Sequence, residues 1–207
     1  ITTATCWMAQ MTWIISTPER LLAMELDSGR ISTMALAGTM PTPADGLCQW
    51  DIKNIREQAI VSDEIIRQLN KAHVHNIRTS TCNVTSGAVA HICTHIYGTV
   101  DSPKDYRKLL DILSPTPALG GWPRYLALQL IRKYEKHPRQ LYGGYISVED
   151  DKIAQAYVTL RCALTDNQGR YCIYTGSGIL SNSHAEAERD ETALKASGLL
   201  NSILNSI

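Results

Sequence analysis

Two separated blocks of β-strand sequence constrain the fold of this chain most strongly. Residues 11–41 contain three strand-like segments, broken at "STPE" and at "DSGR". The second break has the residue types of a tight hairpin turn. Residues 141–148, 154–166 and 170–179 predict three further antiparallel strands, with "DNQG" as the turn between the last two. Hairpins at both ends of the chain predict a large antiparallel sheet.

Helical sequence lies between and after these strands. Four segments predict helices: residues 51–70, 104–113, 124–136 and 185–203. The first has an approximate apolar stripe, made of Ile52, Ile55, Ala59, Ile60, Ile66 and Leu69. Residues 86–100 predict one more strand. Paired strands with helices between them are typical of an α+β fold. We see no internal repeat or linker, so residues 1–207 are expected to form one domain.

Charge and cysteine spacing exclude several classes of function. The chain has 20 basic and 20 acidic residues, so its formal net charge is zero. We therefore expect no nucleic-acid partner and no membrane-surface partner. None of the six cysteines is paired as C-x-x-C. This spacing argues against a structural zinc site and predicts small, buried, reduced cysteines in a cytoplasmic protein.

The first residues of the chain also bear on where it acts. The opening "ITTATCWMAQMTWII" has strand-like sequence and lacks the basic start of a signal peptide. No apolar run has the length of a membrane span. Because the sequence does not begin with methionine, we expect further residues before Ile1 in the native protein.

Acidic side chains on two predicted helices are candidate metal ligands. Glu188, Glu191 and Lys195 have the i, i+3, i+7 spacing that puts them on one helix face. Glu57 lies on the helix predicted for residues 51–70. If the two helices face one cleft, their carboxylates could hold Mg²⁺, which typically takes one or two protein carboxylates. The alternative is a pair of solvated helix faces, with an ion pair between Glu191 and Lys195.

Four further features are candidates for substrate chemistry. "GSG" at residues 176–178 would let backbone N–H groups approach an anion, although such a sequence is often only a turn. Arg161 lies among apolar residues in "VTLRCAL", where a substrate carboxylate or an internal salt bridge could pair with it. His91 lies on an apolar strand, where a core histidine is the alternative. Glu19 could act as a general acid if burial raised its pKa, and is otherwise a loop residue.

Together these segments resemble, in order, the motifs of the chorismate-utilising enzyme family, and within it the isochorismate synthases. The resemblance rests on "STPERLL", "MALAGTMP", "KNIREQAIVSDEI", "AHICTHIYG", "SPTPALGGWPR", "RQLYGGYIS", "VTLRCAL" and "GSGILSNSHAEAERDETALK". The choice of isochorismate synthase depends mainly on "PTPALGG", because relatives that use ammonia or make salicylate tend to carry other sequences there. The resemblance implies an antiparallel two-sheet sandwich with helices packed outside.

The resemblance also implies a reaction. The chain would isomerise chorismate to isochorismate with Mg²⁺, for menaquinone or siderophore biosynthesis. Water attacks C2 and the 4-hydroxyl departs. The implied partner is the small molecule chorismate, and the implied assembly is a monomer or weak dimer.

Site residues follow from the same resemblance. Glu57 and Glu191 would bind Mg²⁺ with support from Glu188, and the metal would hold one substrate carboxylate. Glu19 would protonate the leaving hydroxyl, and His91 would act beside the ring. The implied substrate-binding residues are Gly38, Thr39, Thr94, Tyr142, Arg161, Gly176, Ser177, Gly178 and Lys195.

The sequence departs from the family pattern in three places. Gln58 stands where the family has histidine, and Asn54 where it commonly has an acid. The family's water-activating lysine precedes all the matched segments, so the resemblance covers only the C-terminal portion of a full enzyme. Two alternatives stay open: a salicylate synthase or other chorismate-utilising enzyme, and a non-catalytic chorismate-binding fragment.

Overall fold

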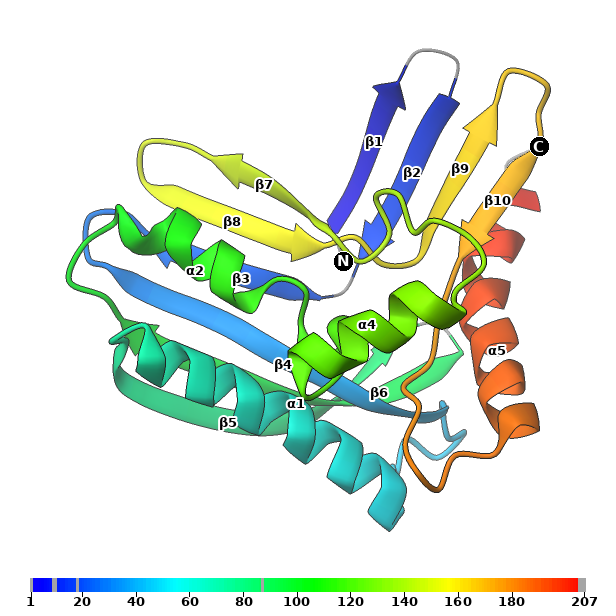
Figure 1. The fold of residues 1–207 in the computed structure, drawn as a ribbon, viewed down its shortest axis with the longest axis horizontal. Helices are drawn as coiled ribbons and strands as arrows, with labels where there is room; N and C mark the ends of the chain where they lie inside the picture. Colours follow the sequence, from blue (N-terminus) through cyan, green and yellow to red (C-terminus); the bar gives the residue numbers. More distant parts are fainter. Residues whose placement is uncertain (1, 9–10, 18, 87, 205–207) are drawn as a thin grey trace.

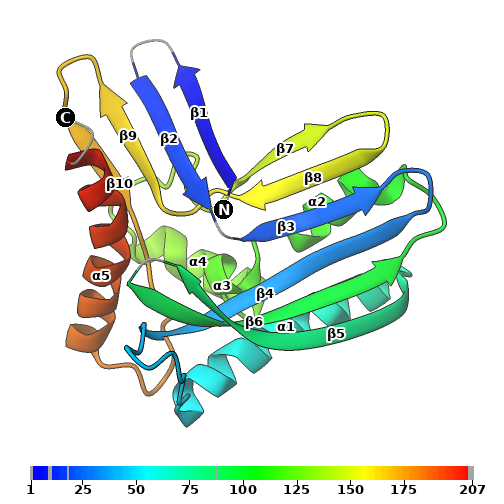
Figure 2. The same cartoon turned by 180° about the vertical axis from the view of Figure 1, so that it is seen from behind.

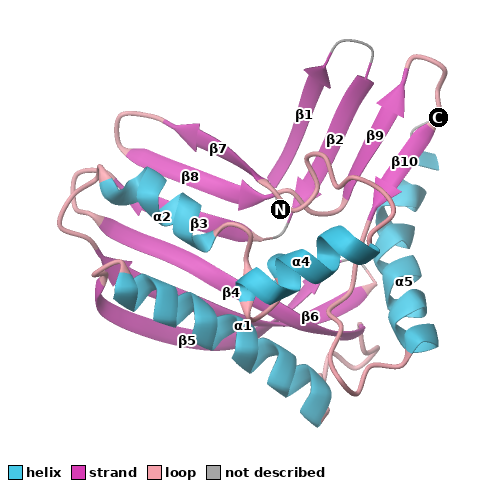
Figure 3. Ribbon diagram, viewed as in Figure 1, coloured by secondary structure: helices cyan, strands magenta, loops and turns pink. Residues whose placement is uncertain are grey.

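The fold consists of two antiparallel sheets and five helices (Figures 1 and 3). This computed structural model describes residues 2–8, 11–17, 19–86 and 88–204. The six-stranded sheet has the order β5 (His75–Ser86), β6 (Val89–Thr99), β4 (Arg30–Pro41), β3 (Arg20–Glu25), β8 (Ile153–Val158) and β7 (Tyr145–Glu149). The four-stranded sheet has the order β1 (Thr2–Met8), β2 (Met11–Thr17), β9 (Cys162–Asp166) and β10 (Tyr171–Tyr174). The predicted α+β class with antiparallel sheets is confirmed.

Helices cover one face of the larger sheet and one edge of the smaller. They are α1 (Ile52–Lys71), α2 (Asp105–Leu113), α3 (Pro117–Gly120), α4 (Arg124–Tyr134) and α5 (Ala185–Leu204). α1 contacts β4 and β6, and α2 contacts β3, on the same side of the sheet (Figures 1 and 2). α5 lies beside β10. Within the described ranges, no helix combines the length and apolarity needed to cross a bilayer.

The main core lies between α1, α2 and the larger sheet. Val61, Ile65 and Leu69 of α1 are buried against strand residues such as Ala35 and Ile96. The apolar stripe predicted for this helix is confirmed at Ile66 and Leu69 but wrong in the first turn, where Ile52 is 80% exposed and Ile55 is 54% exposed. The true buried face includes two polar side chains, Gln58 and Glu64, which a stripe drawn from apolar residues alone could not include.

Two polar side chains of α1 complete the hydrogen bonding of β4. Gln58 Oε1 accepts from Ala37 N–H at 2.8 Å, and its Nε2 donates to Ala35 C=O at 3.1 Å. Asn54 Oδ1 accepts from Thr39 N–H at 2.8 Å. Pairing of β4 with β6 shifts register between Ala37 and Thr39. α1 is therefore tied to β4 at the point where the strand is irregular.

The single strand predicted for residues 154–166 is wrong. β8 ends at Val158 and β9 begins at Cys162, and the two strands belong to different sheets. Arg161 lies between them with φ 44°, in the left-handed region that strand residues do not adopt. The chain therefore crosses from one sheet to the other here, and Arg161 lies at the junction and not on a core strand.

Three smaller differences have local causes. Leu141–Gly144, predicted as strand, forms a turn in which Gly144 N–H donates to Leu141 C=O at 3.2 Å. The prediction omitted β5, whose residues 79–83 are polar or small and exposed, so they lack the alternation of a half-buried strand. It also omitted the single-turn helix α3. Not all cysteines are buried as predicted: Cys82 and Cys172 are exposed, while the Cys6 side chain lies outside the described part.

Replacing Gln58 with leucine should destabilise the fold. The change would leave the Ala37 N–H, the Ala35 carbonyl and the Thr94 hydroxyl without their α1 partner. We expect the free energy of unfolding to fall by about 2–4 kcal/mol, measured by urea titration followed by circular dichroism. Arg56→Gln is the matched control, because Arg56 is an exposed residue of the same helix. An equal effect of both changes would contradict this account.

Candidate active site

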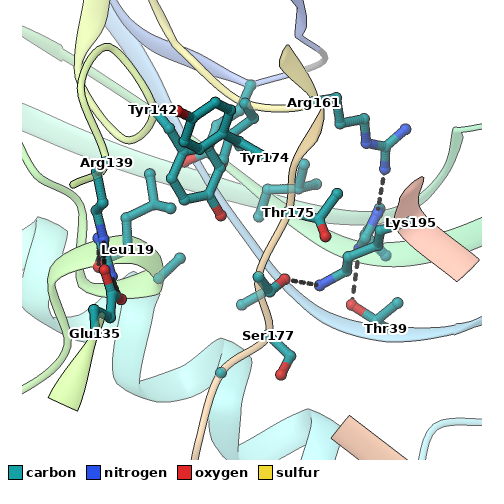
Figure 4. A pocket seen from close by; sticks show the side chains of 18 of the residues that line it. Thr39, Leu119, Glu135, Arg139, Tyr142, Arg161, Tyr174, Thr175, Ser177 and Lys195 are labelled. Atoms are coloured by element: carbon teal, nitrogen blue, oxygen red, sulfur yellow. Dashed lines mark hydrogen bonds and ion pairs between the residues drawn. The ribbon is translucent and has the colours of Figure 1, made fainter. Parts of the chain in front are cut away.

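A cavity of about 410 Å³ lies where the two sheets meet. Figure 4 shows residues from both sheets, from α5 and from the loop before it approaching this space. Most of the predicted site residues line it: Glu19, Thr39, Glu57, His91, Tyr142, Arg161, Gly176, Ser177, Gly178 and Lys195. Segments far apart in the sequence thus converge on one cavity.

Four predicted residues do not line the cavity directly. Glu188 and Glu191 lie on α5 just behind it, where Lys53 and Lys195 pair with them. Gly38 contributes its carbonyl, which is 3.2 Å from His91 Nδ1. Thr94 lies on the opposite face of β6, where its hydroxyl accepts from Gln58 Nε2 at 2.9 Å.

Carboxylates from α1 and α5 face one another. Burial raises the pKa of Glu57, and the negative charge of Glu191 raises it further. Lys195 and Lys53 oppose this effect. Lys53 Nζ is 2.6 Å from Glu188 Oε1, and Lys195 Nζ is 2.7 Å from Glu191 Oε1. The two lysines therefore balance part of the repulsion among three carboxylates.

The oxygen donors of these carboxylates are the ligand type that a hard cation takes. Glu188 is only 5% exposed, and its Oε2 lacks a well-formed hydrogen bond to any described residue. Burial raises the pKa of Glu188, but hydrogen bonds from Lys53 and from the nearby Ser183 and Ser177 hydroxyls lower it overall. An ionised, buried oxygen without a full partner, beside other carboxylates, is the donor chemistry that Mg²⁺ prefers.

Gly176 and Gly178 leave space that the side chains of Tyr142 and Glu57 occupy. A Cβ atom on Gly178 would lie 2.4 Å from Glu57 Oε1. A Cβ atom on Gly176 would lie 2.9 Å from the Tyr142 hydroxyl. The segment is therefore more than a turn: its bare backbone lets a loop pass directly over a carboxylate and a phenol.

A hydrogen-bonded chain orients Arg161. Arg161 Nη2 donates to His91 Nε2 at 3.0 Å, and His91 Nδ1 lies 3.3 Å from Thr39 Oγ1 (Figure 4). Burial lowers the pKa of His91 to about 4, and the charges of Lys195 and Arg161 add to this effect. His91 is therefore neutral at neutral pH. Because its Nε2 accepts from Arg161, its proton lies on Nδ1, toward Gly38 C=O. It positions the guanidinium and carries no charge of its own.

Glu19 is the most strongly perturbed acid of the site. It is 2% exposed, and Oε1 accepts no hydrogen bond from the described residues. Burial raises its pKa to about 8, while the Thr116 hydroxyl and the Lys195 charge lower it by less. The carboxyl is therefore protonated at neutral pH, which is the state that a general acid needs.

Lys195 links the acidic cluster with the cavity. Its Nζ donates to Gly176 C=O at 3.2 Å as well as to Glu191. The ion pair between Glu191 and Lys195, foreseen as the alternative for this helix face, is present, but both side chains are only 18% exposed. The pair therefore belongs to the site and not to a solvated surface.

Sequence reasoning missed several residues of the site. Arg139, Tyr174 and Thr175 line the cavity, and the rings of Tyr142 and Tyr174 stack with centroids 6.0 Å apart. Arg139 lies three residues before Tyr142 in the quoted segment "RQLYGG", which was a usable signal. Lys53 could have been found because it lies one helical turn before Glu57.

Comparisons with known proteins identify relatives of this chain. The chain is 30% identical over 199 residues to the isochorismate synthase EntC of Escherichia coli K12, an alignment that covers 90% of this chain and 49% of EntC. The solved structure of MenF, the menaquinone-specific isochorismate synthase from Escherichia coli, aligns with TM-score 0.81 and 30% identity, covering 92% of this chain and 46% of that one. Anthranilate synthase component I from Streptococcus pneumoniae shares the fold, with TM-score 0.79 and 19% identity over 96% of this chain and 46% of that one.

The extent of these matches decides what they show. This chain spans about half the length of the curated relatives it matches. The family model described as "Chorismate binding enzyme" matches residues 5–204, which is nearly all of the chain. The chain therefore belongs to the chorismate binding enzyme family.

Proposed function

We propose that this chain forms the magnesium and chorismate site of an isochorismate synthase. The observation that carries the proposal is the meeting of Glu57 and Glu191, from opposite ends of the sequence, beside a cavity with separate cationic groups. The similarity to EntC and MenF supports isomerisation of chorismate to isochorismate.

Chorismate carries two carboxylates, and the site offers two kinds of anchor for them. Glu57, Glu188 and Glu191 would hold Mg²⁺, which when bound would neutralise one substrate carboxylate. Arg161, held in place by His91, would pair with the other through its planar fork. The bare backbone at Gly176 and Gly178 leaves room for the substrate between these anchors.

Glu19 supplies the proton in this proposal. Loss of the 4-hydroxyl requires protonation of the departing oxygen, and Glu19 is the buried carboxyl of the cavity that holds a proton at neutral pH. Water would add at C2 and lose a proton to a base, which the family resemblance puts before the matched segments, to give isochorismate with the enolpyruvyl group still attached.

Product analysis tests the proposal directly. The full-length protein, which includes the residues expected before Ile1, is incubated with chorismate and Mg²⁺, and the products are separated by chromatography. Isochorismate without pyruvate supports the proposal. Pyruvate with an aromatic product would favour a salicylate synthase, and binding of chorismate by calorimetry without turnover would favour a non-catalytic chorismate-binding fragment.

Neutralising either cluster carboxylate should abolish the response to magnesium. Mg²⁺ and chorismate together should raise the melting temperature of the wild type, because both bind the folded state. We expect Glu57→Gln and Glu191→Gln to lose this rise. In EDTA, Glu57→Gln should melt no lower than wild type, because it removes a carboxylate whose ionisation burial and Glu191 oppose.

Glu186→Gln is the matched control for these variants, since Glu186 is exposed on the same helix. It should keep the full rise in melting temperature. A normal magnesium response in Glu57→Gln would remove the proposed metal site.

Adding a methyl group at Gly178 should also abolish the response to magnesium, because of a steric clash. Gly178→Ala would put its Cβ against Glu57 Oε1 and displace that carboxylate. We expect loss of the Mg²⁺-dependent rise in melting temperature. Gly198→Ala, in α5 with nothing within 4 Å of its Cβ, should retain the rise and add about 0.5–1 kcal/mol of stability. Retention of the rise in both variants would contradict the assigned role of Gly178.

The pKa of Glu19 predicts a pH dependence of stability. Its pKa is about 8 in the folded chain, against a model-peptide value of 4.5 for the unfolded chain. Between these values the folded state binds more protons, so the free energy of unfolding falls as pH rises. Relative to Glu19→Gln, which mimics the protonated acid, wild type should lose up to about 1.4 kcal/mol per pH unit between about pH 5 and 8. Parallel pH profiles from urea titrations of the two proteins would show that Glu19 ionises normally.

A further inference from the structure

The hairpin of β5 and β6 brings two cysteines and a histidine together. Cys82 of β5 and Cys93 of β6 are directly opposite each other in the antiparallel register. Side chains alternate along a strand, so His95 lies on the same face of β6 as Cys93. Thr94, between them, bonds to Gln58 of α1, so the cysteines and the histidine face away from α1. Figure 2 shows the hairpin with α1 behind it.

The three ligand atoms are spaced as a small ion requires. The two sulfurs and a ring nitrogen all lie within 4.8 Å of one another. The distance from Cys93 Sγ to His95 Nε2 is 3.6 Å. Tetrahedral zinc with bonds of about 2.0–2.3 Å separates its ligand atoms by about 3.5–3.8 Å. Only small side-chain movements separate the present positions from coordination.

We propose that Cys82, Cys93 and His95 bind a thiophilic cation of the zinc class. Two thiolates and an imidazole are a donor set for Zn²⁺ or Cu⁺, whereas Mg²⁺ takes oxygen ligands. The site is therefore chemically distinct from the carboxylate cluster of α1 and α5. Three protein ligands leave the fourth position of a tetrahedral ion open to water or to another molecule.

The surroundings of the site favour a soft ion with access from one side. Cys93 is fully buried, His95 is half-buried and Cys82 is exposed, so an ion would enter past Cys82. Met34 of β4 pairs with His95 of β6. It packs in the same apolar cluster as Cys93 and adds a thioether nearby. Burial raises the pKa of the Cys93 thiol to about 12, so binding must release protons to solvent.

Metal titration of the reduced chain tests this site without reference to catalysis. Co²⁺ is the first probe, because thiolate ligation gives a charge-transfer absorption band, and Zn²⁺ should displace it. We expect one equivalent to bind in the presence of excess Mg²⁺. Cys82→Ser and His95→Gln should each weaken Zn²⁺ binding, measured against a chromogenic chelator, by about tenfold or more.

Cys172→Ser is the matched control, because Cys172 is an exposed cysteine of β10 outside the cluster. It should bind as wild type does. Cys82 is exposed, so its replacement should leave the melting temperature unchanged and keep the test valid even if Cys93→Ser unfolds. The inference is overturned if the reduced wild type binds no Co²⁺, if Mg²⁺ displaces it, or if Cys172→Ser weakens binding equally.

Discussion

The hydrogen bonds from α1 to β4 are the contact on which the site depends. Asn54 and Gln58 bind backbone N–H groups on either side of Gly38, where β4 is irregular. Glu57 lies between these two anchors in the sequence, so fixing them fixes the direction of its carboxylate. If α1 were rotated or shifted by one turn, Glu57 could not meet the acids of α5.

Charge balance is the second constraint. A chain with no net charge holds three carboxylates close together, which is tolerable because Lys53 and Lys195 each form an ion pair with one of them. The pairs are partly buried, so their geometry is more restricted than that of surface pairs. One buried oxygen of this cluster, Glu188 Oε2, lacks a full hydrogen-bond partner among the described residues.

The sequence predicted the fold class, and its motifs named residues that the fold brings together at one cavity. Helical spacing and family motifs indicated the acids and Lys195, since those signals are local. The position of Arg161 could not be foreseen, because a strand-like run of apolar residues conceals the left-handed turn between the sheets. Gln58 and Asn54 are departures from the family pattern in the sequence, and in the fold they bind β4. Their role depends on a contact between elements distant in the sequence.

The cysteines illustrate the same limit. The spacing of the cysteines along the sequence argued against a metal site, and that argument holds for ligands that lie on one strand. Antiparallel pairing puts Cys82 opposite Cys93 although ten residues lie between them, and no spacing rule for consecutive ligands includes that geometry.

The left-handed turn at Arg161 has a mechanical consequence. Residues 159–161 join two sheets whose strands otherwise pair separately, so this crossing helps to set the relative orientation of the sheets. Arg161 lines the cavity at this crossing, and its hydrogen bond to His91 connects the crossing to β6. A molecule that contacts both sheets in this cavity would hold them in one relative orientation, so tight binding would make the junction more rigid.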